Sequence, residues 1–311
     1  MPGVLDILRA RLSRGSRAPH GDGASIALAV EGGAMRGVVS AGMVWALEDL
    51  GYSHAFDAVY GSSAGAINSA YFLAGQAALG TTIYYEDINN RSFIDLGRPL
   101  RGLPIVDLGF LLDDVACNRK RLDVERVLQS RTPLSILATD IDTQQSVAFG
   151  AFTDARHLLD SLRAGATMPI VAGGPFLHEG RHFLDASLSE PIPLPTAEAG
   201  GHTHVVVLLT RSGAMHERPS AFDRYFVGPR LRRISPALAD TYLTRAEPYS
   251  ALLRAIEGGR GVTGTAEVLG VRVDGLHVSK LERRPAVLFE AARRGYRAIE
   301  ELFAADPADF R

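Results

Sequence analysis

The sequence predicts an α/β protein, a three-layer α/β/α sandwich around a mainly parallel central sheet. Two units of strand, glycine turn and helix follow one another within residues 25–75, and this repetition is typical of parallel sheets. Further apolar runs at 134–141 and 204–210 have the composition of central strands, which are buried on both faces. Residues 211–311 are rich in arginine and show helical periodicity, so we expect helical cover in the C-terminal third.

The first unit begins with the apolar run SIALAV at 25–30 and reaches a glycine-rich turn at Gly32 and Gly33. After Arg36, apolar residues recur at helical spacing up to Gly51, which suits a helix C-terminus. We therefore predict a buried strand and then a helix, joined by a turn made mostly of small residues.

The second unit contains the apolar run DAVYG, a predicted buried strand, and then a serine between glycines. Ser63 occupies the central position of G-x-S-x-G, because Gly61 and Gly65 flank it at the required spacing, whereas Ser62 is one position off. Small flanking residues allow a sharp strand-to-helix turn that exposes the serine hydroxyl. Ser63 is a candidate nucleophile, provided that a base and an oxyanion-stabilising group lie nearby.

The loop of the first unit, Val30–Gly37, is a candidate anion site. Glycines let backbone N–H groups face open space, and the following helix N-terminus adds the positive end of its dipole. The P-loop and dinucleotide glycine motifs are absent, which leaves an oxyanion hole or a structural turn as interpretations. Loops of consecutive strand-helix units open at the same sheet edge, so we expect this loop and Ser63 to share one site.

Asp185 is the candidate base. It follows a short alternating segment and precedes a proline-rich loop, where a turn-forming aspartate is the alternative interpretation. An ordinary aspartate is a weak base because its pKa is about 3.9, so a catalytic role requires partial burial that raises its proton affinity. The apolar residues around Asp185 allow such burial.

Taken together and in this order, the motifs resemble those of bacterial patatin-like phospholipases. The family's G-G-G-x-R-G stands at Gly32–Gly37, its G-x-S-x-G at Gly61–Gly65 and its D-G-[GA] at Asp185–Ser187. The stretches PLSILATDID and RAGATMPIVAGGPF also match the family, and the resemblance extends over residues 25–255. Each motif alone has low specificity, whereas the ordered set is specific.

The resemblance implies a patatin-like fold and a serine lipid acyl hydrolase that cleaves fatty-acyl esters of phospholipid or acylglycerol. Ser63 would attack the ester carbonyl and Asp185 would act directly as base, forming an acyl-enzyme without metal or organic cofactor. The remaining site residues that the resemblance implies are Gly32, Gly33 and Ala34 in the oxyanion hole, with Arg36, Gly61 and Gly65 in support.

The chain departs from the family pattern at two places. Ala34 stands where the family has its third glycine, which the backbone accepts if φ at that position is negative. Ala186 and Ser187 follow the aspartate in place of Gly-Gly or Gly-Ala, so the close approach of that loop is in question.

Two alternatives to the dyad enzyme stay open. The first is an α/β-hydrolase esterase with a Ser-His-Asp triad, because several histidines follow Ser63 in the chain. These histidines are His178, His182, His216 and His277. The second is a catalytically silent homologue that binds lipids or partner proteins through the same cleft.

Two patterns that could bind metals are incomplete. His202 and His204 have the spacing of a ligand pair, yet no cysteine or carboxylate follows at ligand spacing. Asp140 resembles the first residue of a calcium loop, but positions six and twelve are Gln145 and Ala151 in place of glycine and glutamate. We therefore predict no metal site.

Composition limits the partners and the location. The net charge of -2 gives no electrostatic footprint for nucleic acid, and the lone Cys117 suits a reducing compartment. No apolar run has the length of a signal peptide or a membrane span, so we expect a soluble cytoplasmic protein. We expect residues 1–23 to form a flexible or amphipathic segment, for which peripheral membrane contact is one option, and 24–311 to form one domain, with a core at 25–210 and helical cover with a closing helix at 211–311.

Overall fold

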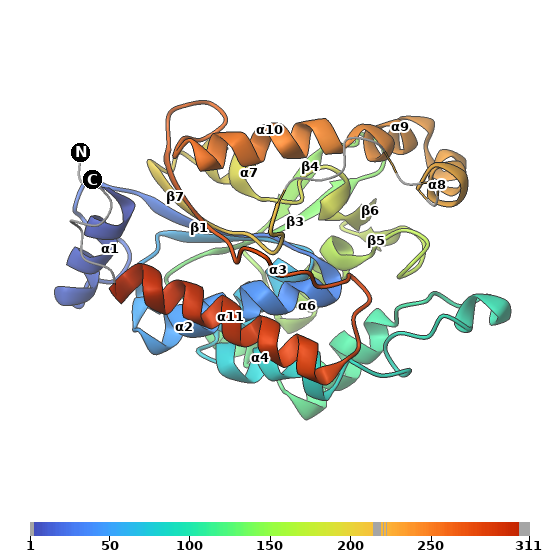
Figure 1. Ribbon diagram of the computed structural model, residues 1–311, viewed down its shortest axis with the longest axis horizontal. Helices are drawn as coiled ribbons and strands as arrows, with labels where there is room; N and C mark the ends of the chain where they lie inside the picture. The colour runs from blue at the N-terminus through green and yellow to red at the C-terminus, as the bar shows by residue number, and fades with distance from the viewer. Residues whose placement is uncertain (1–2, 214–218, 220, 222, 305–311) are drawn as a thin grey trace.

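A computed structural model of the chain describes residues 3–213, 219, 221 and 223–304. One eight-stranded sheet lies between two layers of helices (Figure 1). The strands are β1 (Ile26–Val30), β2 (Ala58–Ser62), β3 (Leu134–Asp140), β4 (Ser146–Phe149), β5 (Phe176–His178), β6 (Arg181–Asp185), β7 (His204–Leu208) and β8 (Glu267–Val271). The α-helices are α1 (Val4–Ser13), α2 (Val38–Asp49), α3 (Ala64–Leu73), α4 (Ala77–Glu86), α5 (Val124–Leu128), α6 (Ala155–Ala166), α7 (Leu194–Ala199), α8 (Gly228–Ile234), α9 (Pro236–Thr244), α10 (Ala246–Glu257) and α11 (Pro285–Ala304). Short 3-10 or π segments are η1 (Ala34–Gly37), η2 (Tyr52–His54), η3 (Arg98–Arg101), η4 (Phe110–Arg119), η5 (Ala186–Leu188) and η6 (Asp223–Val227).

The strand order across the sheet is β5-β6-β3-β2-β1-β7-β8, and β4 pairs with β3. The pairs from β3 to β8 along this order are parallel, whereas β4, β5 and β6 run antiparallel to their neighbours. The predicted α/β class and the mainly parallel sheet are therefore confirmed. Val30 lies opposite Gly61 at the C-terminal ends of β1 and β2, so the two glycine loops leave the sheet side by side.

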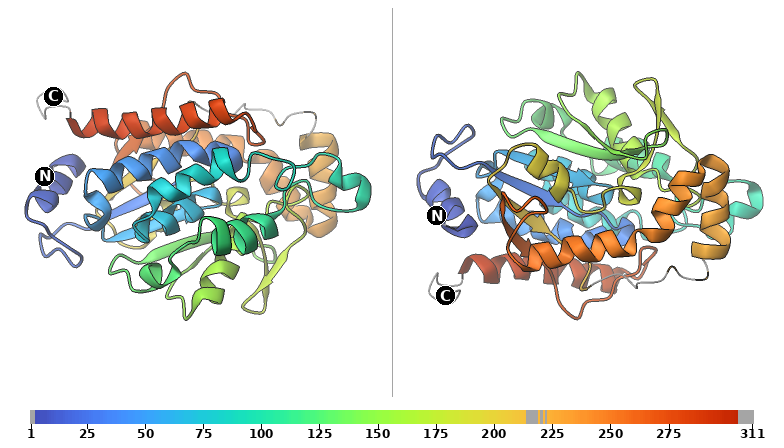
Figure 2. Two further views of the ribbon diagram at one scale, coloured as in Figure 1. Left: turned by 90° about the horizontal axis from the view of Figure 1, so that it is seen from below. Right: turned by 90° about the horizontal axis from the view of Figure 1, so that it is seen from above.

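The central strand β1 shows why the sheet needs cover on both faces. Its leucine and branched residues belong to the large core shared with α2, α3, α4 and α11, whereas Ala27 and Ala29 belong to the smaller core shared with α7 and α10. Figure 2 shows these two helical layers from below and from above. All five β1 residues are buried, which is the expected state of a parallel strand covered by helices on both faces.

Helices α2 and α11 pack backbone to backbone. A Cβ added at Gly42 would lie 2.0 Å from the carbonyl oxygen of Ala292, and one added at Gly295 would lie 2.2 Å from that of Val39. Real Cβ atoms do not approach backbone oxygens this closely, so each helix needs glycine at the point of contact. This pairing fixes the long C-terminal helix against the layer below the sheet (Figure 2).

The N-terminal segment, expected to be flexible or amphipathic, contains helix α1 packed on the body of the protein. Ile7 and Leu8 are buried, and the Arg11 side chain is 2% exposed although it is charged. Arg11 forms ion pairs with Asp22 at 2.7 Å and with Asp57 at 2.8 Å, which offset the cost of burying its charge. The boundary between 1–23 and 24–311 stays a prediction.

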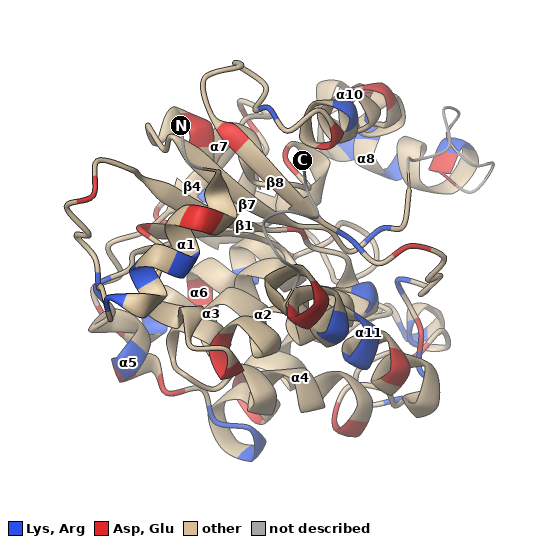
Figure 3. Ribbon diagram, turned by 60° about the vertical axis from the view of Figure 1, so that its left-hand side comes forward, with Lys and Arg blue, Asp and Glu red and all other residues tan. Residues whose placement is uncertain are grey.

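The C-terminal third supplies the expected helices α8 to α11, and also one strand that the sequence patterns did not predict. Residues Glu267–Val271 form β8, parallel to β7 at the edge of the sheet. Only two of its five residues are buried, so its pattern is weaker than that of the central strands, and pairing with β7 decides its conformation. In Figure 3, β1 and β7 are tan and the charged residues lie mostly on the outer helices and loops. Within the residues described, no helix has both the length and the apolar character required to cross a membrane.

Candidate active site

Ser63 lies at the sharp turn between β2 and α3. Its backbone has φ 55° and ψ -127°, a conformation that L-residues rarely adopt and that is found at strained functional turns. A Cβ at Gly61 would lie 2.3 Å from Cα of Ala66, and one at Gly65 would lie 2.3 Å from the oxygen of Val30. Both flanking glycines are thus required by close backbone contacts, and the G-x-S-x-G pattern has a local steric basis.

The hydroxyl of Ser63 donates a hydrogen bond to Oδ2 of Asp185 at 2.6 Å. Both residues are buried, with 5% of Ser63 and 1% of Asp185 exposed. The other carboxylate oxygen, Oδ1, accepts the backbone N–H of Ser187 at 2.8 Å. Asp185 ends β6, and its backbone N–H donates to the oxygen of Thr167 at 2.9 Å, which fixes the main chain that carries the carboxylate. The structure therefore brings Ser63 and Asp185, the two residues that the sequence selected, into direct contact.

Ser62 differs from Ser63 in the partner of its hydroxyl and in its position in the fold. Its side chain is completely buried, and its hydroxyl donates to the backbone oxygen of Glu190 at 2.9 Å. Ser62 is the last residue of β2, whereas Ser63 is the N-cap of α3. The choice of Ser63 over Ser62 from motif position thus agrees with where the two hydroxyls point.

The glycine loop after β1 lies against the Ser63 turn. A Cβ at Gly32 would lie 2.5 Å from the oxygen of Ser62 and 2.7 Å from Cβ of Ser63, so a larger residue would displace the serine. Within the described ranges, the backbone N–H groups of Gly32 and Gly33 donate to no protein acceptor. Ala34 begins η1, where a first-turn N–H has no partner in its own helix. The described contacts thus leave these N–H groups without a protein acceptor, in the loop that lies against the Ser63 turn.

The backbone at Ala34 corrects one expectation. The sequence suggested that alanine fits here with a negative φ, but the observed φ is 50°. Gly33 and Ala34 turn the chain from β1 into η1, which packs against α3, and alanine here adopts the left-handed conformation that glycine adopts more easily. Ala186 and Ser187, the other departure from the family pattern, are not among the described residues with positive φ, so that loop does not need glycine for its backbone conformation.

Glu31 links the glycine loop to two other parts of the chain. Its Oε2 accepts the backbone N–H of Thr210 at 2.5 Å, and its Oε1 accepts the hydroxyl of Tyr249 at 2.8 Å. The hydroxyl of Thr210 also lies 2.7 Å from the oxygen of Gly32. The sequence patterns alone predicted no role for Glu31. A carboxylate directly between an apolar buried strand and a glycine turn was the available signal, because a charge at that point must find internal partners.

A second set of contacts ties the glycine loop to α3. The Nδ2 group of Asn68 donates to the oxygen of Gly37 at 2.9 Å, and Oδ1 of Asn68 accepts the hydroxyl of Tyr84 at 2.9 Å. Burial raises the pKa of Tyr84, so this phenol stays protonated and remains a donor. The loop that carries the N–H donors is therefore fixed to the helix that Ser63 begins.

Arg36, predicted to support the loop, lies beside it and faces a cavity. Its Nε donates to the hydroxyl of Thr210 at 3.2 Å. Burial and the nearby Arg211 lower the pKa of Arg36, which means that the site holds a cation in an unfavourable environment. A Cβ at Gly33 would lie 3.3 Å from the Arg36 side chain, so the glycine also leaves room for this arginine.

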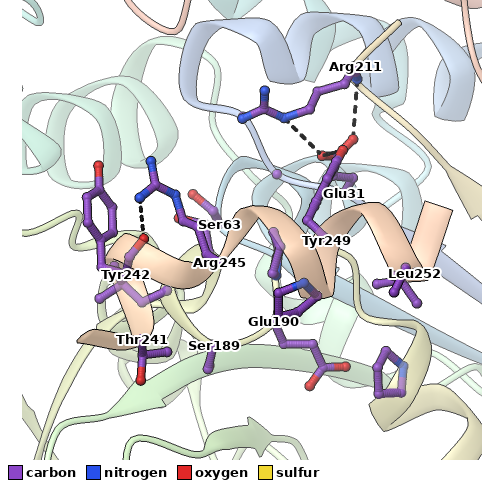
Figure 4. Close-up of a pocket in the computed structure, with 18 of the residues that line it drawn as sticks. Glu31, Ser63, Ser189, Glu190, Arg211, Thr241, Tyr242, Arg245, Tyr249 and Leu252 are labelled. Carbon is purple, nitrogen blue, oxygen red and sulfur yellow. Dashed lines mark hydrogen bonds and ion pairs between the residues drawn. The ribbon is translucent and has the colours of Figure 1, made fainter. Parts of the chain in front are cut away.

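Two cavities meet at Ser63. The larger cavity, about 670 Å³, extends from the glycine loop to the cover helices α9 and α10 (Figure 4). The smaller cavity, about 60 Å³, is lined mainly by apolar residues and also by Asp185. Ser63 and Met168 line both cavities. A bound ester could therefore place one substituent on each side of the serine.

The histidines of the triad alternative have other contacts. His178 lies 3.0 Å from the hydroxyl of Ser161, His182 is exposed in β6, and His277 is exposed after β8. His216 lies outside the described residues. In the part of the chain that the structure describes, no histidine contacts Ser63 or Asp185 through a hydrogen bond, so the geometry gives the triad no support there.

The two metal patterns considered from the sequence are occupied by internal bonds. The rings of His202 and His204 lie beside different hydroxyls, those of Ser25 and Thr203, at 2.7 and 2.8 Å. Asp140 accepts from the backbone of Thr143 at 2.8 Å, as in a local turn. Elsewhere, one group of possible metal ligands lies within 4.8 Å among the described residues, and its members are His157, His178 and Glu179.

Comparison with known proteins agrees with the motifs. A family model described as patatin-like phospholipase matches residues 28–198, more than half of the chain. The curated relative YjjU of Escherichia coli strain K12, named an uncharacterized protein, is 28% identical over 201 residues, which cover 64% of this chain and 56% of that relative. The chain thus spans little more than half of the length of that relative. The solved structure of VipD from Legionella pneumophila aligns with 90% of this chain and 67% of its own, at 11% identity and a TM-score of 0.45.

Proposed function

The chain belongs to the patatin-like phospholipase family, and we propose from this membership and from its site that it is a serine lipid acyl hydrolase. The substrates are fatty-acyl esters, cleaved through an acyl-enzyme on Ser63. The observation that carries the proposal is the 2.6 Å hydrogen bond from the Ser63 hydroxyl to Asp185, beside backbone donors of the glycine loop. A nucleophile, a base and an oxyanion site are the three parts that such chemistry needs.

In the proposed acylation step, Oγ of Ser63 attacks the ester carbonyl carbon while its proton passes to Oδ2 of Asp185. The carbonyl oxygen gains negative charge and is stabilised by the N–H groups of Gly32, Gly33 and Ala34. The C–O bond to the leaving alcohol then breaks, and the alcohol oxygen takes the proton from Asp185. The fatty acyl group remains as an ester of Ser63.

Deacylation repeats these steps with water. Asp185 accepts a proton from the water as its oxygen attacks the acyl carbon, and the same N–H donors stabilise the second oxyanion. The bond to Oγ of Ser63 breaks, Oγ takes back the proton, and the free fatty acid leaves. No step in this scheme requires a histidine, a metal or an organic cofactor.

The two cavities suggest how the ester lies. The smaller cavity is apolar and adjoins both Ser63 and Asp185, which suits the first carbons of the acyl chain. The larger cavity then receives the leaving alcohol, which in a phospholipid or acylglycerol carries the rest of the molecule. This assignment follows from lining chemistry, since the apolar smaller cavity favours methylene groups, whereas the larger cavity also presents charged side chains such as Arg211 and Lys280 to a head group.

The test is fatty-acid release from phospholipids, acylglycerols and short-chain esters, together with labelling by a fluorophosphonate probe. Ser63→Ala should abolish labelling and lower release by roughly a thousandfold or more, because it removes the nucleophile. Ser62→Ala is the matched control and should retain both labelling and release. If the wild-type protein is neither labelled nor active on any ester, the enzymatic proposal fails and the silent lipid-binding or partner-binding alternative replaces it.

A second experiment separates the dyad from a triad. Asp185→Asn should lower fatty-acid release about as much as Ser63→Ala, because the amide cannot accept the serine proton in the same way. Single replacement of each candidate histidine by asparagine should leave release intact. A histidine variant with an equally large loss would establish a triad instead. The histidines to be replaced are His178, His182, His216 and His277.

A further inference from the structure

Four cationic side chains line the larger cavity. They come from distant parts of the chain: Arg36 from η1, Arg211 from the segment after β7, Arg245 from the start of α10, and Lys280 from the segment before α11. Three of the four lie outside residues 28–198, so the motifs shared with the family do not account for them. Most of the cluster thus comes from the part of the chain beyond the family match.

The carboxylates of this cavity are already engaged by neutral donors. Glu190 accepts the backbone N–H of Thr196 at 2.8 Å and its hydroxyl at 2.6 Å. Glu31 accepts from Thr210 and Tyr249, and its closest approach to the Nε of Arg211 is 4.0 Å. Neither carboxylate therefore gives the cluster a close ion pair.

The cations differ in how far they are neutralised. Arg245 is 3.4 Å from Asp223, and its guanidinium also lies over the Tyr242 ring at 3.5 Å (Figure 4). For Arg36 and Lys280, by contrast, no carboxylate of the described residues lies within ion-pair distance. Within the described ranges, two of the four charges thus have no anionic partner, although both line a cavity next to Ser63.

The environment of Lys280 also favours an anionic ligand in this cavity. Burial, together with the charges of Arg36 and Arg211, lowers the pKa of its ammonium to about 8. Arg245 adds to this effect and the Asp185 carboxylate opposes it. A bound anion would remove the mutual repulsion among these cations, whereas a bound cation would add to it.

We propose that the larger cavity binds the phosphate group of an ester lipid whose head group carries net negative charge. Lys280 and Arg211, with Arg36 beside them, form the phosphate site, and the scissile ester reaches Ser63 in the same cavity. The proposal rests on the proposed hydrolase function for the lipid as substrate, but phosphate binding can be measured without turnover. A zwitterionic head group is disfavoured, because its ammonium would enter a cavity lined by four cations.

The kinetic experiment compares two phosphodiesters with identical acyl chains, dihexanoyl phosphatidylglycerol and dihexanoyl phosphatidylcholine. The readout is the ratio of kcat/KM for the anionic lipid to that for the zwitterionic lipid. We expect Lys280→Met to lower this ratio about tenfold, the usual scale for one charge-assisted hydrogen bond, and Lys280→Arg to retain most of it. Lys120→Met is the matched control, since Lys120 is the only other lysine and pairs with Glu86 at 2.5 Å. A wild-type ratio near one, or an equal ratio in Lys280→Met, overturns the proposal while leaving the hydrolase function intact.

The binding experiment uses the full chain with Ser63→Ala, so that no lipid is consumed. Calorimetry should show tighter binding of dihexanoyl phosphatidylglycerol than of dihexanoyl phosphatidylcholine, and Lys280→Met in the same background should remove the difference. Inorganic phosphate and glycerol 3-phosphate serve as probes for a free phosphate ligand. If the site binds a lipid head group instead, both compounds should bind much more weakly than dihexanoyl phosphatidylglycerol. If wild type hydrolyses no ester yet binds the anionic lipid selectively, the hydrolase proposal fails and the phosphate site stands. Equal binding of both lipids overturns the phosphate site.

Discussion

The phenol of Tyr249 donates a hydrogen bond to Oε1 of Glu31 at 2.8 Å, across 218 residues of sequence. Through this contact the cover helix α10 touches the glycine loop that lies against the Ser63 turn. Burial, and after it the charge of Glu31, raises the pKa of Tyr249, so the phenol stays protonated and continues to donate. The geometry of the proposed oxyanion site therefore depends on a residue from the C-terminal third of the chain.

Tyr249→Phe should weaken both the fold and the site. The buried Glu31 carboxylate loses one of its donors, and a hydrogen bond to a charged group contributes about 1.5 to 3 kcal/mol. We expect a lower melting temperature and a lower kcat with a smaller change in KM, because the ring still lines the cavity. Thermal unfolding and steady-state kinetics check this, with the exposed Tyr225→Phe as control. A kcat equal to that of Tyr225→Phe would show that the contact between Tyr249 and Glu31 does not affect the geometry of the glycine loop.

The backbone at Ala34 gives a prediction about stability. An L-residue in the left-handed region costs roughly 1 kcal/mol relative to glycine, so Ala34→Gly should raise the free energy of unfolding by about 0.5 kcal/mol after the added chain entropy. Ala41→Gly in α2 is the control and should lower it by about 1 kcal/mol. Denaturant unfolding measures both. Equal losses in the two variants would mean that φ at Ala34 is not strained.

The sequence predicted those parts of the site that depend on neighbours in the chain. The elbow at Ser63 needs small residues two positions away on each side, and Gly61 and Gly65 are visible in any window around it. The α/β class followed in the same way from apolar runs and helical spacing. The proximity of Ser63 to Asp185 came from the resemblance, because 122 residues separate the two and no local pattern joins them.

What could not be predicted depends on contacts between distant residues. In the sequence, Glu31 is only a residue next to a glycine turn. Its contacts with Thr210 and Tyr249 depend on the fold. Strand β8 has a mixed pattern and owes its conformation to pairing with β7. Lys280 lies in a segment without regular structure, and only the fold places it among three arginines. The positive φ at Ala34 could not be predicted either, because alanine usually adopts a negative φ.

The contact between α2 and α11 predicts an inverted effect of alanine. In an ordinary helix interior, Gly→Ala stabilises by up to about 1 kcal/mol. At Gly42 the new methyl would lie 2.0 Å from the backbone oxygen of Ala292, so Gly42→Ala should instead lower the free energy of unfolding by about 1 to 3 kcal/mol. Gly174→Ala, where nothing lies within 4 Å, is the control. Denaturant unfolding that shows a more stable Gly42→Ala protein would contradict the backbone contact.

The phosphate site predicts how substrate preference changes with pH. The free enzyme's Lys280 has a pKa of about 8, and a bound phosphate raises it, because the opposite charge favours the ammonium. Below about pH 8 the lysine is already protonated and binding is independent of pH. Above that value binding must take up a proton, so affinity for the anionic lipid falls up to about tenfold per pH unit until the pKa of the complex is reached.

The measurement is again the ratio of kcat/KM for phosphatidylglycerol to that for phosphatidylcholine, followed through the pH range on both sides of about 8. The ratio cancels any pH dependence of the chemical steps, because both lipids would use the same proposed dyad, and neither phosphodiester changes its own charge in this range. Wild type should lose its anionic preference above about pH 8, whereas Lys280→Arg should keep it, since a guanidinium stays charged. The same decline in Lys280→Arg would assign the titration to another group, and a constant wild-type ratio would remove Lys280 from the site.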